Sequence, residues 1–469
     1  MTPKLPDAPI VLINIVGLTR GLLGENTPNL NRLAEETEAK PMEGVFPAVT
    51  TTAQVSMLTG KLPGEHGIVG NGWYWREQAE VKFWQQSNHL IQSKKIWDNV
   101  RQYKPDFRCS NMFWWYNMYA DVNYSVTPRP HYPADGRKIV GLYSNPPDLH
   151  AKLEEVLGKF PFFNFWGPTA DIRSSEWIAS AAALEFSWHR PDLQLVYLPH
   201  LDYNLQRLGP EHPDVVEDVR QIDKVAGELI DKVRALGAQV MVVSEYGISQ
   251  THRSLALNRL LREHGYIAVR DSLGTELLDA GASRAFAVAD HQVAHVYVKQ
   301  AEDIPTVKQL LEQAEGVAQV LDRQQMRQWG VDNERSGDLM ALAERDCWFS
   351  YYYWFDDDKA PDFAPTVDIH RKPGYDPAEL FIDPEIRLPK LRVLRRLAQK
   401  ALGFRMLMDV IPLNGKQVHG SHGRLAESAD EQPLLLSSIP EAIAGIDRLT
   451  DVHDFLLGYF SARSDKQGD

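Results

Sequence analysis

Three short apolar runs constrain the fold of this chain more than any other feature. They cover residues 10–16, 193–198 and 239–244, and apolar residues dominate each of them. Runs of this length and composition are typical of strands that are buried on both faces of a parallel sheet. A helical pattern fills about residues 214–236, between the second and the third run. This alternation predicts an α/β fold in which helices flank a mostly parallel central sheet.

The residues just after these strands are the first candidates for chemistry, because ligands of such sheets bind at the carboxyl ends of strands. Glu245 directly follows the third run, and Asp202 lies four residues after the second. A functional role is favoured for Glu245, since an unpaired buried carboxylate is costly. For Asp202 two interpretations remain open, a ligand in a site or a cap of the helix that follows its strand.

Two regions are expected to interrupt the sheet-forming core. Residues 72–135 are rich in tryptophan and tyrosine, and residues 284–364 show a strand at 294–298, a helix at 306–314 and a strand at 316–321. The predicted division is a core of residues 1–71, 136–283 and 365–469, an aromatic-rich insertion at 72–135 and a small α+β insertion at 284–364. Tryptophans are most often core residues, although a group of them beside a site can also stack on a ligand.

The charge of the chain argues against two classes of general partner. The formal net charge is −13, which disfavours nucleic-acid polymers and anionic membrane surfaces. Cys109 and Cys347 are too few for a disulfide framework and are expected to be buried thiols. Without an evident signal segment or a membrane-spanning run, we expect a cytoplasmic protein. The oligomeric state is left open.

Residues 46–71 carry the strongest functional signal. A cluster of hydroxyl side chains, Thr50 to Thr52, stands at a predicted helix start, and a glycine-rich turn that ends on Asn71 follows the helix. The first turn of a helix has unpaired N–H groups and a positive dipole end, so it favours anions. Thr50 alone is also consistent with a helix cap. The spacing of Thr50 from Asn71 and from the glycines at 60–70 favours an anion site.

This layout resembles the nucleotide pyrophosphatase/phosphodiesterase branch of the alkaline phosphatase superfamily. That branch has a Pro-x-x-Thr nucleophile, a Thr-Gly-x-x-Pro-x-x-His-Gly-Ile run and a phosphate-binding asparagine, which match Thr50, residues 59–68 and Asn71. The resemblance implies an alkaline-phosphatase-like three-layer sandwich. It also implies that Thr50 attacks phosphorus to form a covalent phospho-threonine, while Asn71 stabilises the oxyanion.

The resemblance also implies a metal centre, but the ligand positions diverge. Family members use two metal ions to clamp the phosphoryl oxygens. At the matching positions this chain keeps Asp202 and His422, whereas four other positions differ. They hold Val16 for Asp, Gln206 for His, and Glu245-Tyr246 for an Asp-His pair. We expect one or two divalent cations, most consistently zinc and alternatively manganese, with Asp202, Glu245 and His422 as ligands.

Substitute ligands can be sought nearby. Asn14 lies two residues before Val16 and so points to the same side of the strand. His291 and His370 each lie next to or near an aspartate, in residues 290–295 and 368–370. The structural alternatives are satisfied histidines for these two, and a plain surface loop for His422.

Three further residues are candidates for substrate binding. Arg371 and Lys372 could pair with a phosphate or could form a solvated charged face, and Trp73 could stack on a substrate ring or belong to the core. The leading expectation is hydrolysis of a phosphodiester, phosphomonoester or phosphonate ester of a small phosphorylated metabolite. Two alternatives remain open, a pseudoenzyme that binds such a metabolite without turnover and a transferase of the phosphoryl or alcohol group.

Overall fold

The computed structural model describes residues 8–134 and 137–461. Strand β1 (Ile10–Ile15) lies at the centre of an eight-stranded sheet, with β8 (Leu193–Leu198) and β9 (Gln239–Val243) parallel to it on its two sides. The three predicted strands are therefore confirmed. Every residue of β1 and β8 is buried, as expected for strands covered on both faces. The outer ends of the first and last core segments, and the junction at 135–136, lie outside the described residues.

The other strands complete the order β2-β20-β9-β1-β8-β5-β6-β7. They are β2 (Lys40–Pro41), β5 (Cys109–Met112), β6 (Tyr124–Pro128), β7 (Leu142–Asn145) and β20 (Leu434–Ser437). β5 and β6 lie parallel beside β8, whereas β7, β20 and β2 run antiparallel to their neighbours. The region expected as an insertion at 72–135 thus supplies two strands of the large sheet. Their short, partly polar sequences hide this role.

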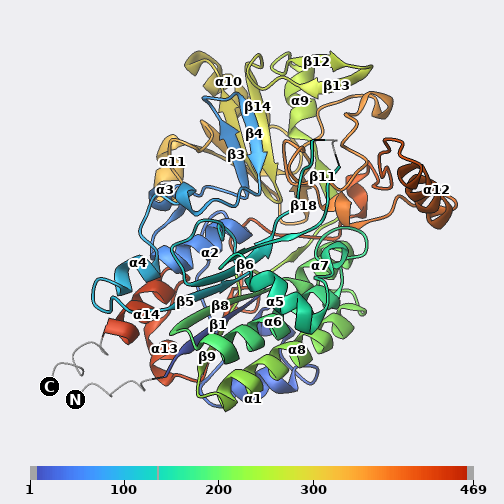
Figure 1. Ribbon diagram of the computed structural model, residues 1–469. Coiled ribbons are helices and arrows are strands. Elements are labelled where there is room, and N and C mark those ends of the chain that lie inside the picture. The colour runs from blue at the N-terminus through green and yellow to red at the C-terminus, as the bar shows by residue number, and fades with distance from the viewer. Residues whose placement is uncertain (1–7, 135–136, 462–469) are drawn as a thin grey trace.

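Helices cover both faces of this sheet (Figure 1). One group comprises α1 (Pro28–Ala34), α5 (Leu149–Leu157), α6 (Ile172–His189), α7 (His200–Leu208) and α8 (Val215–Ala235). The other comprises α2 (Thr50–Thr59), α4 (Ile96–Val100), α13 (Pro440–Gly445) and α14 (Asp451–Ser461). α8 confirms the predicted helix, and its buried residues recur at helical spacing along one face.

A second, smaller unit lies above the carboxyl ends of the central strands (Figure 1). Its antiparallel sheet has the order β14-β15-β17-β16. The strands are β14 (Ala285–Asp290), β15 (Val293–Val298), β16 (Val317–Asp322) and β17 (Leu339–Ala343), with helices α10 (Ile304–Glu312) and α11 (Arg323–Gln328). The two strands and the helix predicted for this region are confirmed.

Smaller elements surround these two sheets. The short strands are β3 (Gly72–Trp75) with β4 (Glu80–Phe83), β10 (Ser249–Gln250) with β19 (Gly420–Ser421), β11 (Arg253–Leu255) with β18 (Cys347–Phe349), and β12 (Val269–Ser272) with β13 (Thr275–Leu278). The remaining α-helices are α3 (Pro63–His66), α9 (Leu257–Glu263) and α12 (Pro389–Ala401). The 3-10 helices are Arg20–Leu22, Asn88–Leu90, Phe162–Asn164, Ala301–Asp303, Asp357–Lys359, Pro377–Leu380 and Gly415–Gln417.

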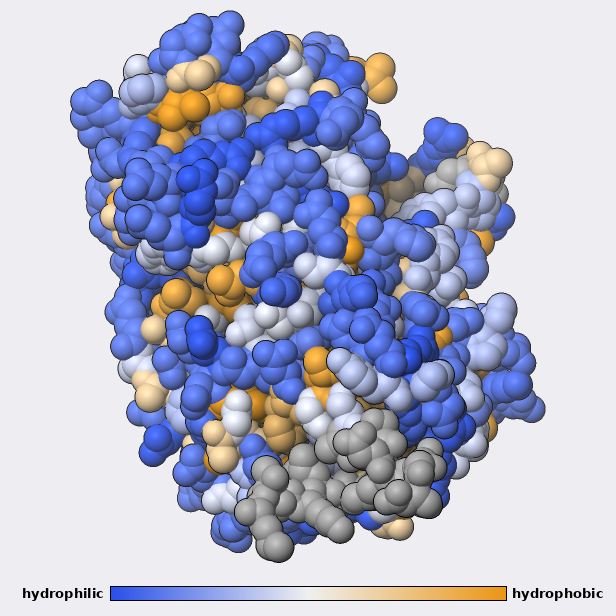
Figure 2. Space-filling view, turned by 90° about the vertical axis from the view of Figure 1, so that its left-hand side faces the viewer, coloured by the Kyte–Doolittle hydropathy of each residue, from blue (hydrophilic) through white to orange (hydrophobic). Residues whose placement is uncertain are grey.

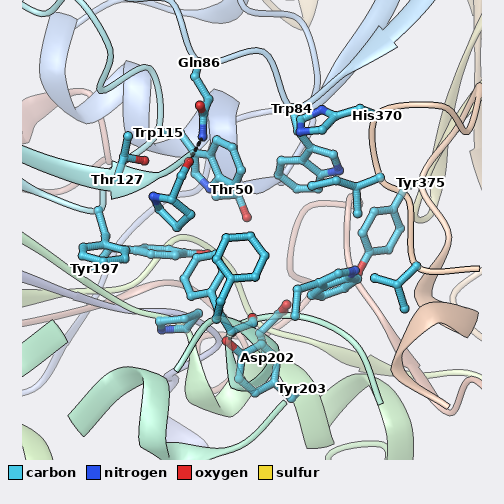
Figure 3. A pocket seen from close by; sticks show the side chains of 18 of the residues that line it. Thr50, Trp84, Gln86, Trp115, Thr127, Tyr197, Asp202, Tyr203, His370 and Tyr375 are labelled. Carbon is cyan, nitrogen blue, oxygen red and sulfur yellow. Dashed lines mark hydrogen bonds between the residues drawn. The ribbon is translucent and has the colours of Figure 1, made fainter. Parts of the chain in front are cut away.

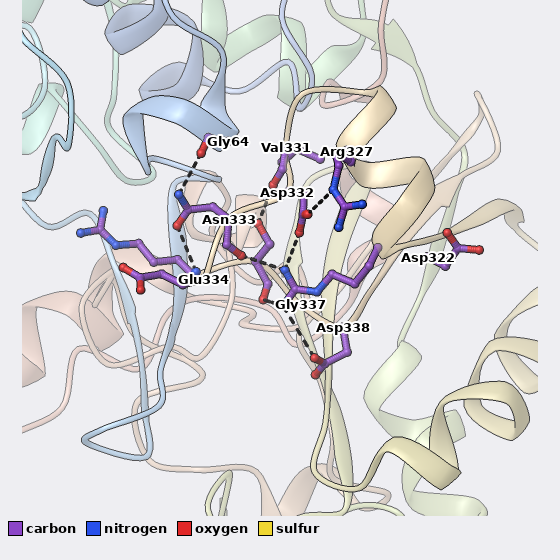
Figure 4. A network of polar contacts seen from close by, with 12 residues as sticks. Gly64, Asp322, Arg327, Val331, Asp332, Asn333, Glu334, Gly337 and Asp338 are labelled. Atoms are coloured by element: carbon purple, nitrogen blue, oxygen red, sulfur yellow. Dashed lines mark hydrogen bonds and ion pairs between the residues drawn. The ribbon is translucent and has the colours of Figure 1, made fainter.

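A polar network fastens the smaller unit to the turn that follows α2 (Figure 4). Arg323 pairs with Asp332 at 2.6 Å, and the side-chain amide of the adjacent Asn333 donates to the carbonyl oxygen of Gly64 at 2.9 Å. The glycine-rich turn is thereby held from outside the central sheet. This attachment fixes the path of the chain from α2 to Asn71.

The hydropathy of one face of the molecule and of the helices is that of a largely polar exterior. The face of the molecule in Figure 2 is mainly hydrophilic, and its apolar side chains form small separate groups. None of the helices in residues 8–134 and 137–461 combines the length and the apolar composition needed to cross a bilayer.

Candidate active site

Thr50 begins α2 and faces a pocket at the carboxyl end of the central sheet (Figure 3). Val49, not Thr50, is the N-cap residue, so the capping alternative does not describe the Thr50 side chain. Thr50 is buried, and its Oγ1 lies 3.0 Å from the hydroxyl of Tyr246. That tyrosine in turn donates to Oδ1 of Asp202 at 3.5 Å. The hydroxyl of Thr50 is therefore held in a fixed position at a helix N-terminus.

Asn71 is fixed beside the start of α2. Its Oδ1 accepts the backbone N–H of Thr51 at 3.1 Å, and its Nδ2 and backbone N–H both donate to Asp290, at 3.1 and 2.8 Å. The hydroxyl of Thr51 donates to the carbonyl of Gly70 at 2.8 Å and so binds the protein rather than the pocket. Asp290 is a positioning residue for Asn71, whereas in the sequence it stood out only as the aspartate beside His291.

Glu245 lies in a buried network of neutral amides. The Nδ2 of Asn14 and the Nε2 of Gln54 donate to its Oε1 at 2.5 and 2.6 Å, and the backbone N–H of Trp115 fixes the Gln54 amide at 2.7 Å. Burial raises the pKa of Glu245 to about 8, against the lowering effect of these hydrogen bonds. The carboxyl group is therefore protonated at neutral pH. The sequence analysis did not predict Gln54 as a site residue.

We expect Glu245→Gln to become more stable than the wild type as the pH rises. The folded-state pKa of about 8 exceeds the ordinary 4.5, so the folded protein holds this proton more tightly than the unfolded chain. The contribution of Glu245 to stability is then greatest below pH 4.5 and is lost as the pH rises through 8. Glutamine keeps the acceptor for both amides and cannot ionise.

Thermal unfolding of both proteins between about pH 6 and pH 9 measures this difference. The variant should gain several degrees over the wild type at the upper end of the range. A difference in melting temperature that stays constant over the range would show that Glu245 is already ionised in the folded protein, as a metal ligand would be.

Asp202 and His422 face each other across the pocket floor. The Nε2 of His422 lies 4.0 Å from Oδ1 of Asp202, and its Nδ1–H donates to the carbonyl of Ala48 at 2.8 Å. The amide of Gln206 donates to the other oxygen of Asp202 at 2.7 Å and accepts the hydroxyl proton of Tyr375 at 2.7 Å. Burial raises the pKa of Asp202 to about 7 and lowers that of His422 well below its ordinary value, so this imidazole is neutral.

Four rings, one of them that of His422, follow one another at close spacing, with the two histidine rings tilted against each other. The ring centroids of Tyr246 and His422 lie 3.6 Å apart, those of His422 and His291 3.7 Å, and those of His291 and Tyr375 3.6 Å. The Nδ1 of His291 bonds to Asp290 at 2.8 Å. The sequence-predicted His291 is thus brought to the site, where it packs between two rings.

The donors present do not fit the two-metal centre implied by the resemblance. Within the described part of the chain, no three or more His, Cys, Asp or Glu side chains gather closely enough to hold a metal ion. Zinc takes three or four protein ligands. Val16 offers no donor atom, and the amides of Gln206 and Asn14 donate to carboxyl groups. Asp202, Glu245 and His422 therefore do not assemble as the expected ligand set. The amides bond one oxygen of each carboxyl group, whereas Oε2 of Glu245 and Oδ1 of Asn14 are buried without a hydrogen-bond partner.

The pocket itself is mostly aromatic (Figure 3). Its floor is formed by Thr50, Asp202, Tyr246 and His422, and Lys138 and His370 add polar groups to the wall. The aromatic lining consists of Trp84, Phe113, Trp115, Phe162, Phe165, Trp166, Tyr197, Tyr203 and Tyr375. Such a lining suits a ligand with an apolar or aromatic portion and one anionic end.

The structure places the four remaining predicted residues in different surroundings. His370 lies in the pocket wall, where its Nδ1 faces the carbonyl of Phe83 at 3.4 Å, whereas Arg371 is exposed. Lys372 is 1% exposed and pairs with the carboxylates of Asp376 and Glu379 at 2.7 and 2.8 Å, so it serves the fold.

Trp73 is also buried and stacks on Trp75, outside the pocket lining. Its hairpin position directs the ring into the smaller unit, where Arg335 lies over it. The tryptophans that reach the pocket are Trp84, Trp115 and Trp166.

Comparisons with known proteins agree with this architecture. Residues 10–376 match the model of the family described as type I phosphodiesterase / nucleotide pyrophosphatase. A solved structure of phosphonoacetate hydrolase from Sinorhizobium meliloti in complex with phosphonoformate is similar, with a TM-score of 0.61 and 14% identity, over 97% of this chain and 96% of that one. An inactive variant of murine ectonucleotide pyrophosphatase / phosphodiesterase 5 in complex with AMP has a TM-score of 0.58 and 14% identity, over 97% and 95%. These neighbours show an alkaline-phosphatase-like fold.

The matches to relatives found by sequence cover only part of each chain. An uncharacterized pyrophosphatase/phosphodiesterase of Schizosaccharomyces pombe is 26% identical over 52% of this chain and 45% of its own length. Human ectonucleotide pyrophosphatase/phosphodiesterase family member 7 is 24% identical over 58% of this chain and 54% of its own length. The chain therefore spans about half the length of these relatives. The family match, in contrast, covers most of the chain, and this chain belongs to the type I phosphodiesterase / nucleotide pyrophosphatase family, a hydrolase branch of the alkaline phosphatase superfamily.

Proposed function

We propose that this protein hydrolyses a small phosphate or phosphonate ester, with the phosphoryl group bound at the start of α2 and Thr50 as the nucleophile. The observation that carries the proposal is the buried hydroxyl of Thr50 on the first turn of α2, beside Asn71 and open to the pocket. Backbone N–H groups at such a helix end stabilise the negative charge that develops on the phosphoryl oxygens.

The proton of Thr50 has a path away from the nucleophile. Tyr246 donates to Asp202, so its oxygen can accept the proton of Thr50 while its own proton passes to the ionised carboxylate of Asp202. As the bond between Thr50 Oγ1 and phosphorus forms, the bond to the ester oxygen breaks and the leaving alcohol takes up a proton from solvent. Water then attacks the phospho-threonine and releases the acid, which restores the hydroxyl of Thr50.

The substrate class follows from the pocket lining. Aromatic side chains surround the space beside Thr50, which favours an ester whose alcohol or phosphonate substituent is an aromatic or apolar group. The neighbours solved with AMP and with phosphonoformate bind small anionic phosphorus compounds. A small phosphorylated metabolite of this kind is the ligand we propose.

A second candidate function is binding of the same class of ligand without turnover. The specific observation that favours it is the pair of amide hydrogen bonds from Asn14 and Gln54 to Glu245, whose raised pKa favours a neutral carboxyl group beside the nucleophile. Without a concentrated positive charge near the phosphoryl group, the attack of Thr50 loses one source of transition-state stabilisation.

Release of nitrophenol from bis(4-nitrophenyl) phosphate, 4-nitrophenyl phosphate and 4-nitrophenyl phenylphosphonate tests the proposal. We expect turnover of at least one ester, undiminished by a chelator because the donors do not form a metal centre. A methyl ester of the phosphoryl or phosphonyl group, formed in place of the free acid when methanol is present, would identify a transferase. Binding of phenylphosphonate without turnover of any ester would select the second candidate, and the absence of both would refute the two proposals together.

A further inference from the structure

Residues 386–408 differ in charge from the rest of the chain. They hold seven lysine and arginine residues and no acidic residue, within a protein of formal net charge −13. The overall charge predicts repulsion from anionic surfaces, but it averages over this segment. The local charge of this segment can therefore attract an anionic surface that the net charge of the whole molecule repels.

Helix α12 (Pro389–Ala401) forms the centre of this segment, and none of its side chains is buried. Leu388, Leu391, Leu394 and Leu397 follow one another at intervals of three residues and are 64%, 58%, 62% and 47% exposed. Side chains at this spacing share one stripe of a helix. Leu402, Phe404 and Leu407 extend the exposed apolar surface beyond the helix. Isolated exposed leucines are ordinary, but seven large apolar side chains in twenty residues are not.

The opposite side of α12 is fastened to the body of the protein. Val393 packs with the small core around Val410 and Ile411, and Arg392 and Arg396 both pair with Asp409. This attachment leaves the leucine stripe directed away from the core. Figure 1 shows α12 projecting from the molecule, apart from both sheets.

We propose that α12 docks this protein on an anionic membrane surface, with the leucine stripe among the lipid chains at the interface. The exposed basic residues that flank the stripe would contact lipid phosphates. They are Arg387, Lys390, Arg395, Lys400 and Arg405. An amphipathic helix with a leucine-rich face and a lysine- and arginine-rich polar face lies in the plane of the interface, and each basic residue near an anionic leaflet strengthens the attachment.

Charge complementarity selects the lipid surface over another copy of this helix. Two copies of α12 that met through their leucine stripes would bring two rows of basic side chains together. An anionic bilayer instead presents lipid chains to the leucines and negative charge to the basic side chains. The proposal does not depend on the proposed catalytic activity, because it involves no residue of the pocket floor.

Co-sedimentation of the full-length protein with lipid vesicles tests this proposal. We expect binding to vesicles of phosphatidylcholine with about 30% phosphatidylserine, and binding to pure phosphatidylcholine about tenfold weaker or more. Salt should weaken the former. Leu391→Glu/Leu394→Glu and Arg395→Glu/Lys400→Glu should each reduce binding about tenfold or more, with melting temperatures unchanged because these side chains are exposed.

Leu273→Glu is the matched control, since this leucine is fully exposed on the turn between β12 and β13, far along the chain from α12. It should bind vesicles as the wild type does. Equal loss in the control, or wild-type affinity in both α12 variants, would overturn the proposal. So would a dimer in light scattering that the leucine variant abolishes, because the stripe would then belong to an interface between two copies.

Discussion

Thr50→Val is expected to reduce turnover of phosphoryl esters by about 10³-fold or more, without a significant change in melting temperature. Valine has nearly the shape of threonine but no hydroxyl group, so the site loses its nucleophile while the packing of α2 is kept. Steady-state kinetics on the ester that the wild type turns over best measures the loss.

The neighbouring hydroxyl groups provide the controls. Thr127 lines the same pocket from β6, so Thr127→Val makes the same chemical change away from the helix start and should cost at most a few-fold. Thr51 and Thr52 donate to the carbonyl oxygens of Gly70 and Pro47, so neither is directed at the pocket. Thr51→Ala combined with Thr50→Val tests any substitution of one hydroxyl for the other. Activity retained in this double variant would exclude the covalent mechanism.

Lys372→Met should destabilise the protein by about 3–5 kcal/mol. The ammonium group is buried between the carboxylates of Asp376 and Glu379, and its removal leaves two buried acidic groups without their cation. Glu379 also accepts the indole N–H of Trp166 at 2.6 Å, so the pocket wall depends on the same cluster. Unfolding by urea at neutral pH measures the change.

Arg371→Met is the matched control for Lys372→Met, because it removes the charge of the preceding residue. The Arg371 side chain is 64% exposed, and its pair with Asp368 is correspondingly weak, so the variant should lie within about 0.5 kcal/mol of the wild type. If Lys372→Met instead kept the stability of the wild type and lost affinity for phosphonates, the lysine would be a ligand-binding residue after all.

The central part of the fold could be predicted because its signals are local. An apolar run such as residues 10–15 is buried on both faces, and the amphipathic spacing of residues 215–235 is visible in the sequence itself. β5 could not be recognised in the same way, since it carries Ser110 and Asn111 in four residues. Those polar side chains find partners in the tertiary structure, among them Glu185, which accepts the hydroxyl proton of Ser110.

The residues of the candidate site likewise differ in whether local sequence could predict them. Thr50 and Asn71 lie within one motif, and the fixed spacing of that motif is enough to bring them together. The anchoring of Asn71 by Asp290 joins residues 219 positions apart, and the Gln54–Glu245 bond joins residues 191 apart. Pairings of this kind leave no periodic trace in a single sequence. For Lys372 the reason is different. Its partners Asp376 and Glu379 lie nearby in the sequence, but the burial that makes them its ion-pair partners is set by the fold.

A crystal structure of the protein with phenylphosphonate tests the central claim most directly, namely that the start of α2 is the phosphoryl site. We predict that the phosphonate oxygens lie within hydrogen-bond distance of Thr50 and the backbone N–H groups of the first turn of α2. The phenyl ring should lie among Trp84, Trp115 and Tyr375, which line the pocket. A phosphonate bound at Lys138 and His370 instead, with the hydroxyl of Thr50 still bonded only to Tyr246, would contradict the account.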